Sequence, residues 1–177
     1  MACATAQLAP NLVNTQQIHD RVEQPGYTLI TGASAGLGAE FANQLAALGH
    51  SLILVARREQ KLKDLSNTLR TKHGVATQII VADLSKPEGP NYVVETCLHS
   101  GWQVDWLINN AGVAGPDLLL DRCWQEQQEF YQLMMLSVAQ LCHSFIPGMV
   151  NRNFGRVINI ASVAARVPRS GGCNYGP

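Results

Sequence analysis

The sequence predicts an α/β protein built on a doubly wound parallel sheet. Short apolar runs alternate with longer amphipathic stretches, and a glycine-rich turn directly follows the first apolar run. The later runs also end in small or polar residues. Alternating strands and helices favour a parallel sheet with right-handed crossovers. Ligands of such sheets bind beyond the carboxyl ends of the strands, so the residues that follow each apolar run are the candidate site.

The first half of the domain is expected to contain three strands, at residues 27–31, 51–55 and 76–82, and two helices. The uninterrupted apolar run at residues 51–55 is typical of a strand that is covered on both faces. The first helix runs from about Gly36 to Gly49, and the second spans residues 59–73 and stops at Gly74. Their apolar stripes, which should face the core, comprise Leu37, Phe41, Leu45 and Leu48 in the first helix and Leu62, Leu65 and Leu69 in the second.

The second half continues the alternation. Residues 85–88 read Ser-Lys-Pro-Glu, a capping box that predicts a helix from there to about Ser100. A strand follows at residues 104–108, then a long helix over residues 121–151 that bends near Pro147, and a last strand at residues 156–160. Residues 1–25 carry no comparable pattern and are expected to form a loosely ordered N-terminal arm. Residues 26–177 are expected to form one domain.

Composition narrows the class of protein. Charged residues make up 15% of the 177 residues, and 13 Lys and Arg balance 13 Asp and Glu, so no overall field would attract nucleic acid. Five widely spaced cysteines without a Cys-x-x-Cys pair indicate free thiols and a cytoplasmic location. No secretory signal is visible, and no apolar stretch of 18 residues lacks a charge or a turn, which predicts no membrane span. The five histidines have no metal-ligand spacing, so no metal site is expected.

The glycine-rich turn at residues 31–38 is typical of a dinucleotide site. Glycines let a pyrophosphate approach the backbone, and the amides of the following helix N-terminus favour an anion. Arg57 lies 19 residues after Gly38, in the neighbourhood that meets the adenosine ribose. A guanidinium suits a ribose 2′-phosphate, whereas an acidic side chain would suit a free 2′-hydroxyl. The alternative is that Arg57 and Arg58 are simply solvated residues before a helix.

Three further segments complete a pattern. They are Asp83-Leu84 after the third strand, Asn-Asn-Ala-Gly at residues 109–112 after the fourth, and Ser162 with Tyr175 thirteen residues later, after the fifth. Together with residues 31–38, they make the chain resemble the short-chain dehydrogenase/reductase family over about residues 26–177. The resemblance implies a Rossmann domain that binds NADP(H), because Arg57 stands where NAD users carry an acidic residue.

The resemblance also assigns roles to individual residues. It implies that the residue matching Asp83 contacts the adenine amino group and that residues 109–112 line the cofactor. The cofactor-binding residues expected on this basis are Gly32, Ser34, Gly36, Leu37, Gly38, Arg57, Arg58, Asp83, Leu84, Asn110, Ala111 and Gly112. The expected catalytic residues are Ser162, which would polarise the substrate oxygen, and Tyr175, which would transfer the proton.

Two departures from the family pattern are visible. The family places a lysine four residues after the tyrosine, which here would be position 179, beyond the last residue. The chain is therefore expected to lack the last strands of the family fold, either as an incomplete record, which we favour, or as a truncated product. Counting back from Pro147, Met134 falls where the family usually carries an asparagine that holds a water in a proton relay.

The function that these features predict is NADP(H)-dependent interconversion of a carbonyl and a secondary alcohol in a small-molecule substrate. The alternative is a truncated, catalytically inactive nucleotide-binding or scaffold protein. An S-adenosylmethionine-binding Rossmann domain is disfavoured by Ser162, Tyr175 and the paired arginines. Because the family commonly uses the helix beginning at Asp121 as a dimer face, a homo-oligomer is also an expectation.

Overall fold

The computed structural model describes residues 26–117 and 123–162. The arm at residues 1–25 and Tyr175 lie outside these ranges. All neighbouring strands are parallel and form a five-stranded sheet in the order β3-β2-β1-β4-β5. The strands are β1 (Tyr27–Thr31), β2 (Leu52–Ala56), β3 (Thr77–Val81), β4 (Val104–Asn109) and β5 (Arg156–Asn159). The helices are α1 (Gly36–Ala47), α2 (Glu59–His73), α3 (Glu88–His99), α4 (Trp124–Tyr131) and α5 (Ser137–Asn151), and a π-helical segment, η2 (Gln132–Leu136), joins the last two.

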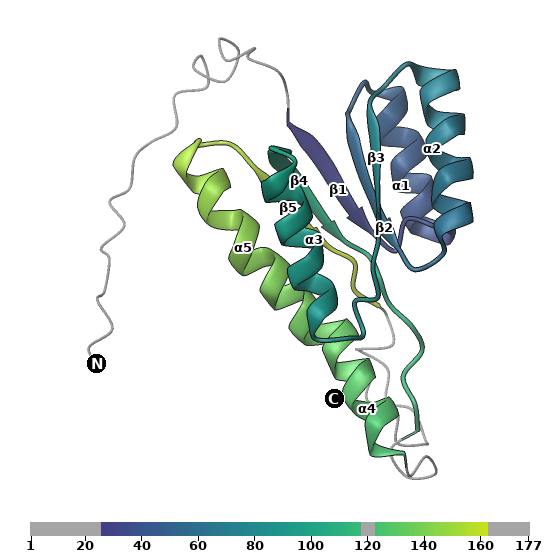
Figure 1. The fold of residues 1–177 in the computed structure, drawn as a ribbon, viewed down its shortest axis with the longest axis vertical. Helices are drawn as coiled ribbons and strands as arrows, with labels where there is room; N and C mark the ends of the chain where they lie inside the picture. Colours follow the sequence, from purple (N-terminus) through teal and green to yellow (C-terminus); the bar gives the residue numbers. More distant parts are fainter. Residues whose placement is uncertain (1–25, 118–122, 163–177) are drawn as a thin grey trace.

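Helices cover the sheet on both sides, as the predicted doubly wound fold requires (Figure 1). One core cluster combines sheet residues with Ala42 and Leu45 of α1 and with Leu62 and Leu69 of α2. The second combines the other sheet face with side chains of α3 and α5, among them Val93 and Leu141. The alternation of strands and helices therefore predicted the fold class correctly.

The inward face of α1 differs from the predicted stripe. Leu45 is buried, but Leu37 and Leu48 are 63% and 76% exposed. The buried face instead carries Gly38, Ala42, Leu45 and Ala46. A Cβ on Gly38 would lie 2.4 Å from the Gly32 carbonyl oxygen, so α1 packs closely against the glycine-rich turn on the face that carries small residues.

The capping box expected before α3 does not form. The N-cap position is Pro87, without a side-chain cap hydrogen bond. The Ser85 hydroxyl instead donates to Asp83 Oδ1 at 2.7 Å, and the Ser85 amide donates to the same oxygen at 3.0 Å. Ser85 therefore forms a local turn with the Asp83 side chain instead of capping α3. Asp and Ser side chains often form such local hydrogen bonds with nearby backbone groups.

The long helix is α-helical on both sides of η2, and α5 continues through Pro147. Its departure from α-helical geometry thus lies at residues 132–136, not at the proline where a bend was expected. The continuous helical stretch Trp124–Asn151 contains an 18-residue window with a mean hydropathy of 1.5, which is long and apolar enough to cross a membrane, a candidate that was not expected from the sequence. This is weak evidence for a span, because core helices of soluble proteins pass the same test.

The outer edge of β3 is covered by a side chain of α2. Arg70 Nε donates to the Thr77 hydroxyl at 2.7 Å, and Arg70 Nη2 donates to the Thr77 carbonyl oxygen. Because the neighbouring Ala76 carbonyl accepts from Leu52 of β2, the Thr77 carbonyl points the other way, toward the open edge of the sheet. The buried Ser66 hydroxyl completes the cluster, 2.6 Å from Thr77 Oγ1.

Candidate functional site

The glycine-rich turn joins β1 to α1 in a conformation that side chains would obstruct. Gly32 and Gly36 adopt φ angles of +68° and +55°, in the left-handed region that favours glycine. A Cβ on Gly38 would lie 2.4 Å from the Gly32 carbonyl oxygen and 2.5 Å from Asn110 Nδ2. The N-cap residue of α1 is Ala35, which has no side-chain acceptor for the first amides of the helix. These amides therefore suit an anion such as a pyrophosphate.

The loop that follows β4 is hydrogen-bonded to this turn through Thr31. The Thr31 hydroxyl oxygen accepts from the amides of Asn110 at 2.9 Å and Ala111 at 3.0 Å. In return, Asn110 Nδ2 donates to the Thr31 carbonyl oxygen at 2.9 Å. The predicted residues of the glycine-rich turn and of the Asn-Asn-Ala-Gly segment thus lie together. Sequence reasoning did not identify Thr31 as the residue that joins them.

The two arginines after β2 have different partners. Arg58 directs two nitrogens at the Ser34 hydroxyl, with Nε at 3.1 Å and Nη2 at 2.8 Å. Arg57 lies beside Asp83, with Nη1 and Oδ2 separated by 3.8 Å, and its side chain is 63% exposed. Such an exposed and long ion pair is weak, so the Arg57 guanidinium can take up an additional anion. Ser34, Arg57 and Arg58 together offer hydrogen-bond donors to a phosphate group.

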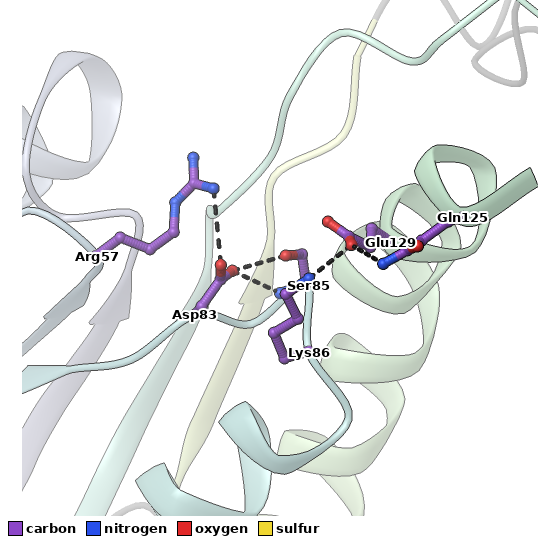
Figure 2. A network of polar contacts seen from close by, with 6 residues as sticks. All are labelled: Arg57, Asp83, Ser85, Lys86, Gln125 and Glu129. Carbon is purple, nitrogen blue, oxygen red and sulfur yellow. Dashed lines mark hydrogen bonds and ion pairs between the residues drawn. The ribbon is translucent and has the colours of Figure 1, made fainter. Parts of the chain in front are cut away.

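Asp83 follows β3 and lies between Arg57 and Ser85 (Figure 2). Partial burial opposes its ionisation, but the two hydrogen bonds from Ser85 and the charges of Arg57 and Lys86 together lower the pKa of its carboxyl group below the ordinary value. The group is therefore a carboxylate at neutral pH. It can accept a hydrogen bond from an amino group of a ligand.

The predicted cofactor contacts Leu84 and Leu37 differ in how exposed their side chains are. Leu84 is 4% exposed and belongs to the core cluster under α3, so only its backbone is available to a cofactor. Leu37 is exposed in the first turn of α1. Gly112 faces η2, since a Cβ on it would lie 3.3 Å from Met134 Sδ. Met134 thus packs against the loop after β4. It occupies the position at which the resemblance expects an asparagine.

Ser162 lies just beyond β5, at the end of the described residues. The Ile160 amide donates to the Asn109 carbonyl oxygen at 2.9 Å, and Asn109 Nδ2 donates to Asn159 Oδ1 at 2.9 Å. These bonds fix the segment that leads to Ser162 against the end of β4. Asn109, the first residue of the Asn-Asn-Ala-Gly segment that was expected to line the cofactor, thus also positions the end of β5. The expected proton donor, Tyr175, lies outside the described residues.

The predicted site residues that the structure describes therefore meet at one edge of the sheet, beyond the carboxyl ends of the strands. This edge offers a backbone cradle for a pyrophosphate, two guanidinium groups and a carboxylate. Within residues 26–117 and 123–162, no group of three or more His, Cys, Asp or Glu could hold a metal ion. The donor set fits a dinucleotide cofactor.

Comparison with known families and proteins supports this description. Residues 27–177 match the family model described as short chain dehydrogenase. An uncharacterized oxidoreductase of Mycobacterium bovis is 37% identical over 150 residues, which cover 81% of this chain and 44% of that protein. A very-long-chain 3-oxoacyl-CoA reductase of Laccaria bicolor is 33% identical, covering 80% of this chain and 43% of the relative. The chain thus aligns with less than half the length of these relatives.

Solved structures share the fold. A short-chain dehydrogenase from Sphingobium yanoikuyae, solved in complex with NADPH, superposes with a TM-score of 0.78 at 34% identity and covers 86% of this chain and 59% of its own. A bulky-bulky ketone specific alcohol dehydrogenase from Comamonas testosteroni gives a TM-score of 0.78 at 31% identity, covering 86% and 61%.

Proposed function

The chain belongs to the short-chain dehydrogenase family, and we propose that it carries the cofactor-binding half of an NADP(H)-dependent oxidoreductase that interconverts a carbonyl and a secondary alcohol. Gly32, Gly36 and Gly38 would hold the pyrophosphate, and Asp83 would accept a hydrogen bond from the adenine. When bound, the cofactor supplies or takes up the hydride. The substrate in this proposal is a small molecule.

The observation that carries the preference for NADP(H) is the arrangement of Ser34, Arg57 and Arg58. Arg58 holds the Ser34 hydroxyl with two nitrogens, and Arg57 projects from the same strand end. A ribose 2′-phosphate would find two guanidinium groups and a hydroxyl there, whereas NAD(H) would leave the cations without an anion. The NADPH complex of the Sphingobium yanoikuyae relative is consistent with this preference.

The reaction requires a group that polarises the substrate oxygen and a group that transfers a proton. Ser162 would donate a hydrogen bond to the oxygen from its position beyond β5. Tyr175 would transfer the proton. An isolated phenol has a pKa of about 10, so Tyr175 needs a neighbouring cation to act near neutral pH. The family lysine that would supply this charge corresponds to position 179.

The names of two relatives bear on the class of substrate. One is a very-long-chain 3-oxoacyl-CoA reductase and the other is specific for bulky ketones. Both names indicate a ketone rather than an aldehyde, and we extend that preference to this protein. The loop at residues 113–117 would contribute to the substrate pocket, with residues 164–173 as a further expectation. A cytoplasmic location and a homo-oligomer are part of the same proposal.

Two measurements on the full-length protein test the proposed function. The first is titration with NADPH and NADH, in which NADPH is expected to bind more tightly. The second follows NADPH absorbance with a panel of ketones and aldehydes. Oxidation of NADPH that depends on a ketone supports the proposal. NADPH binding without turnover of any carbonyl would favour a nucleotide-binding protein without catalysis, and equal affinity for NADH would remove the role given to the arginines.

A further inference from the structure

An ion pair connects the loop after β3 to α4 across the edge of the sheet (Figure 2). Lys86 Nζ lies 2.5 Å from Glu129 Oε1, and Gln125 Nε2 donates to the same oxygen at 3.2 Å. The hydrogen bond to Glu129 raises the pKa of Lys86. The hydrogen bonds from Lys86 and then Gln125 lower the pKa of Glu129. Both partners are therefore charged at neutral pH, although 43 residues separate them in the sequence.

On the β3 side, Lys86 is held in the turn that carries Asp83. The Lys86 amide donates to the Asp83 carbonyl oxygen at 3.2 Å, and the Gly89 amide donates to the Lys86 carbonyl oxygen at 3.0 Å. A Cβ on Gly89 would lie 2.0 Å from the Asp83 carbonyl oxygen, so the turn is closely packed against the start of α3. Consequently, Lys86 and Asp83 belong to one compact unit.

On the other side, Glu129 belongs to a helix that contacts the loop after β4. Gln127 is buried in α4, and its Nε2 donates to the Asp117 carbonyl oxygen at 3.4 Å. α4 continues into η2, where Met134 packs against Gly112. Since α4 extends beyond the carboxyl ends of the strands, its position bears directly on the edge where the cofactor is proposed to bind (Figure 1).

We propose that Lys86 and Glu129 are positioning residues of the cofactor site. Their ion pair fixes α4 against the loop after β3, and through Gln127 and Met134 it fixes the spacing between that loop and the loop after β4. The π-helical segment makes such a tie useful, because this geometry is less regular than an α-helix and is frequent at functional sites. The ligand named in the test, NADPH, rests on the proposed function.

An exposed ion pair by itself contributes little to stability, so the proposal needs a matched control. α2 provides one in Lys63 and Glu59, whose charged atoms lie 2.6 Å apart. Both residues belong to the same helix, so their pair connects no separate elements. Replacing Lys63 by Met removes an ion pair of similar length, between more exposed side chains, without freeing a loop.

The first experiment measures backbone amide hydrogen exchange in the cofactor-free, full-length protein. Lys86→Met and Glu129→Gln are each expected to speed exchange in residues 124–131 and in residues 110–117, and the double variant should add little to either. Lys86→Arg should preserve the wild-type rates, and Lys63→Met should leave both segments unchanged. The proposal is overturned if Lys86→Met and Glu129→Gln leave residues 110–117 as slow as in the wild type.

The second experiment titrates the same variants with NADPH. Both Lys86→Met and Glu129→Gln are expected to weaken binding about threefold, in the range of exposed ion pairs. Glu129→Gln is the decisive variant, because removing a negative charge would otherwise favour an anionic cofactor. Unchanged or tighter NADPH binding by Glu129→Gln overturns the proposal. If the wild-type protein fails to bind NADPH, the proposed function fails, and hydrogen exchange alone decides the role of the ion pair.

Discussion

The edge of the sheet beyond the carboxyl ends of the strands, where the cofactor is proposed to bind, is here called the cofactor edge. Its two sides differ in how deeply their strands are buried. On the side of β1 and β2, the strands are almost completely buried, and the glycine-rich turn is packed so closely that a Cβ on Gly38 cannot be accommodated. On the side of β5, most residues of the strand are exposed, and among the described strands it pairs with β4 alone. Ser162 reaches its place there through the hydrogen bonds around Asn109.

The difference separates two kinds of residue. At the glycine-rich turn after β1, the backbone itself is proposed to form the binding surface, so substitutions of its glycines should change folding and cofactor affinity together. On the β5 side, side chains are proposed to act on the reacting atoms. Substitutions there should change turnover and leave the cofactor bound. Four experiments on the full-length protein test this division.

The largest effect is expected from Tyr175→Phe. Loss of a positioned proton donor should lower kcat by about 10²–10⁴-fold, because general acid–base catalysis contributes on that order. The dissociation constant for NADPH should stay close to the wild-type value. Steady-state kinetics with a ketone substrate and an NADPH titration measure the two quantities, with Tyr92→Phe in α3 as the control. A near-normal kcat would show that another group donates the proton.

Gly38→Ala should act in the opposite way, on folding and binding. The added methyl group would overlap the Gly32 carbonyl oxygen, and overpacking of this kind costs about 1–3 kcal/mol. We expect a lower Tm and a loss of measurable NADPH binding. Gly74→Asn is the control, since Gly74 has a φ of +68° in open space and asparagine tolerates that conformation. If Gly38→Ala has the Tm and the NADPH affinity of the wild type, close packing of the glycine-rich turn is not required for folding or for cofactor binding.

Arg57→Asp should change the choice of cofactor. The substitution removes a donor to the 2′-phosphate and adds a repulsive charge, so NADPH should bind about tenfold more weakly, as expected for a lost charge-assisted hydrogen bond. NADH should lose much less affinity. Arg156→Asp on the exposed β5 makes the same change in net charge and should affect neither cofactor. Equal losses for NADPH and NADH in Arg57→Asp would contradict the assignment.

The smallest effect concerns the pH dependence of stability. Because the pKa of Asp83 is lower in the folded protein than in the unfolded chain, its carboxylate stabilises the fold at pH values above the unfolded pKa, and this contribution is lost as the pH falls through the folded pKa. Asp83→Asn should therefore reduce stability slightly at neutral pH and reduce its loss in acid. Urea midpoints between about pH 2 and pH 7 measure this. A wild-type acid profile in Asp83→Asn would show that the Ser85 hydrogen bonds contribute nothing.

The sequence predicted most of the fold because its signals are local. The turn at residues 31–38 directly follows a buried strand, and α2 was placed at its observed ends by its leucine spacing and Gly74. The inward stripe of α1 was wrong at Leu37 and Leu48, because the face that packs against the sheet carries small residues such as Gly38 and Ala42. The cap before α3 was wrong because Ser85 bonds to Asp83 instead.

Contacts between distant residues could not be predicted. Thr31 joins Asn110 across 79 residues and Lys86 reaches Glu129 across 43, and no spacing rule links such positions. The π-helical segment had no sequence signal either, whereas Pro147 gave a misleading one. The residues that line the site were thus visible in the sequence, but those that hold its parts together became visible only in three dimensions.

The Arg70 cluster on β3 has a consequence for solubility. The end strand of a sheet offers free carbonyl groups on which a strand of another molecule can pair. At Thr77 that position is occupied by a guanidinium held from α2, so a second chain would have to displace a charged group before pairing there. Loss of Arg70 would expose a template for aggregation at the opposite end of β3 from Asp83, so this substitution would lower solubility while leaving every residue proposed to bind the cofactor unchanged.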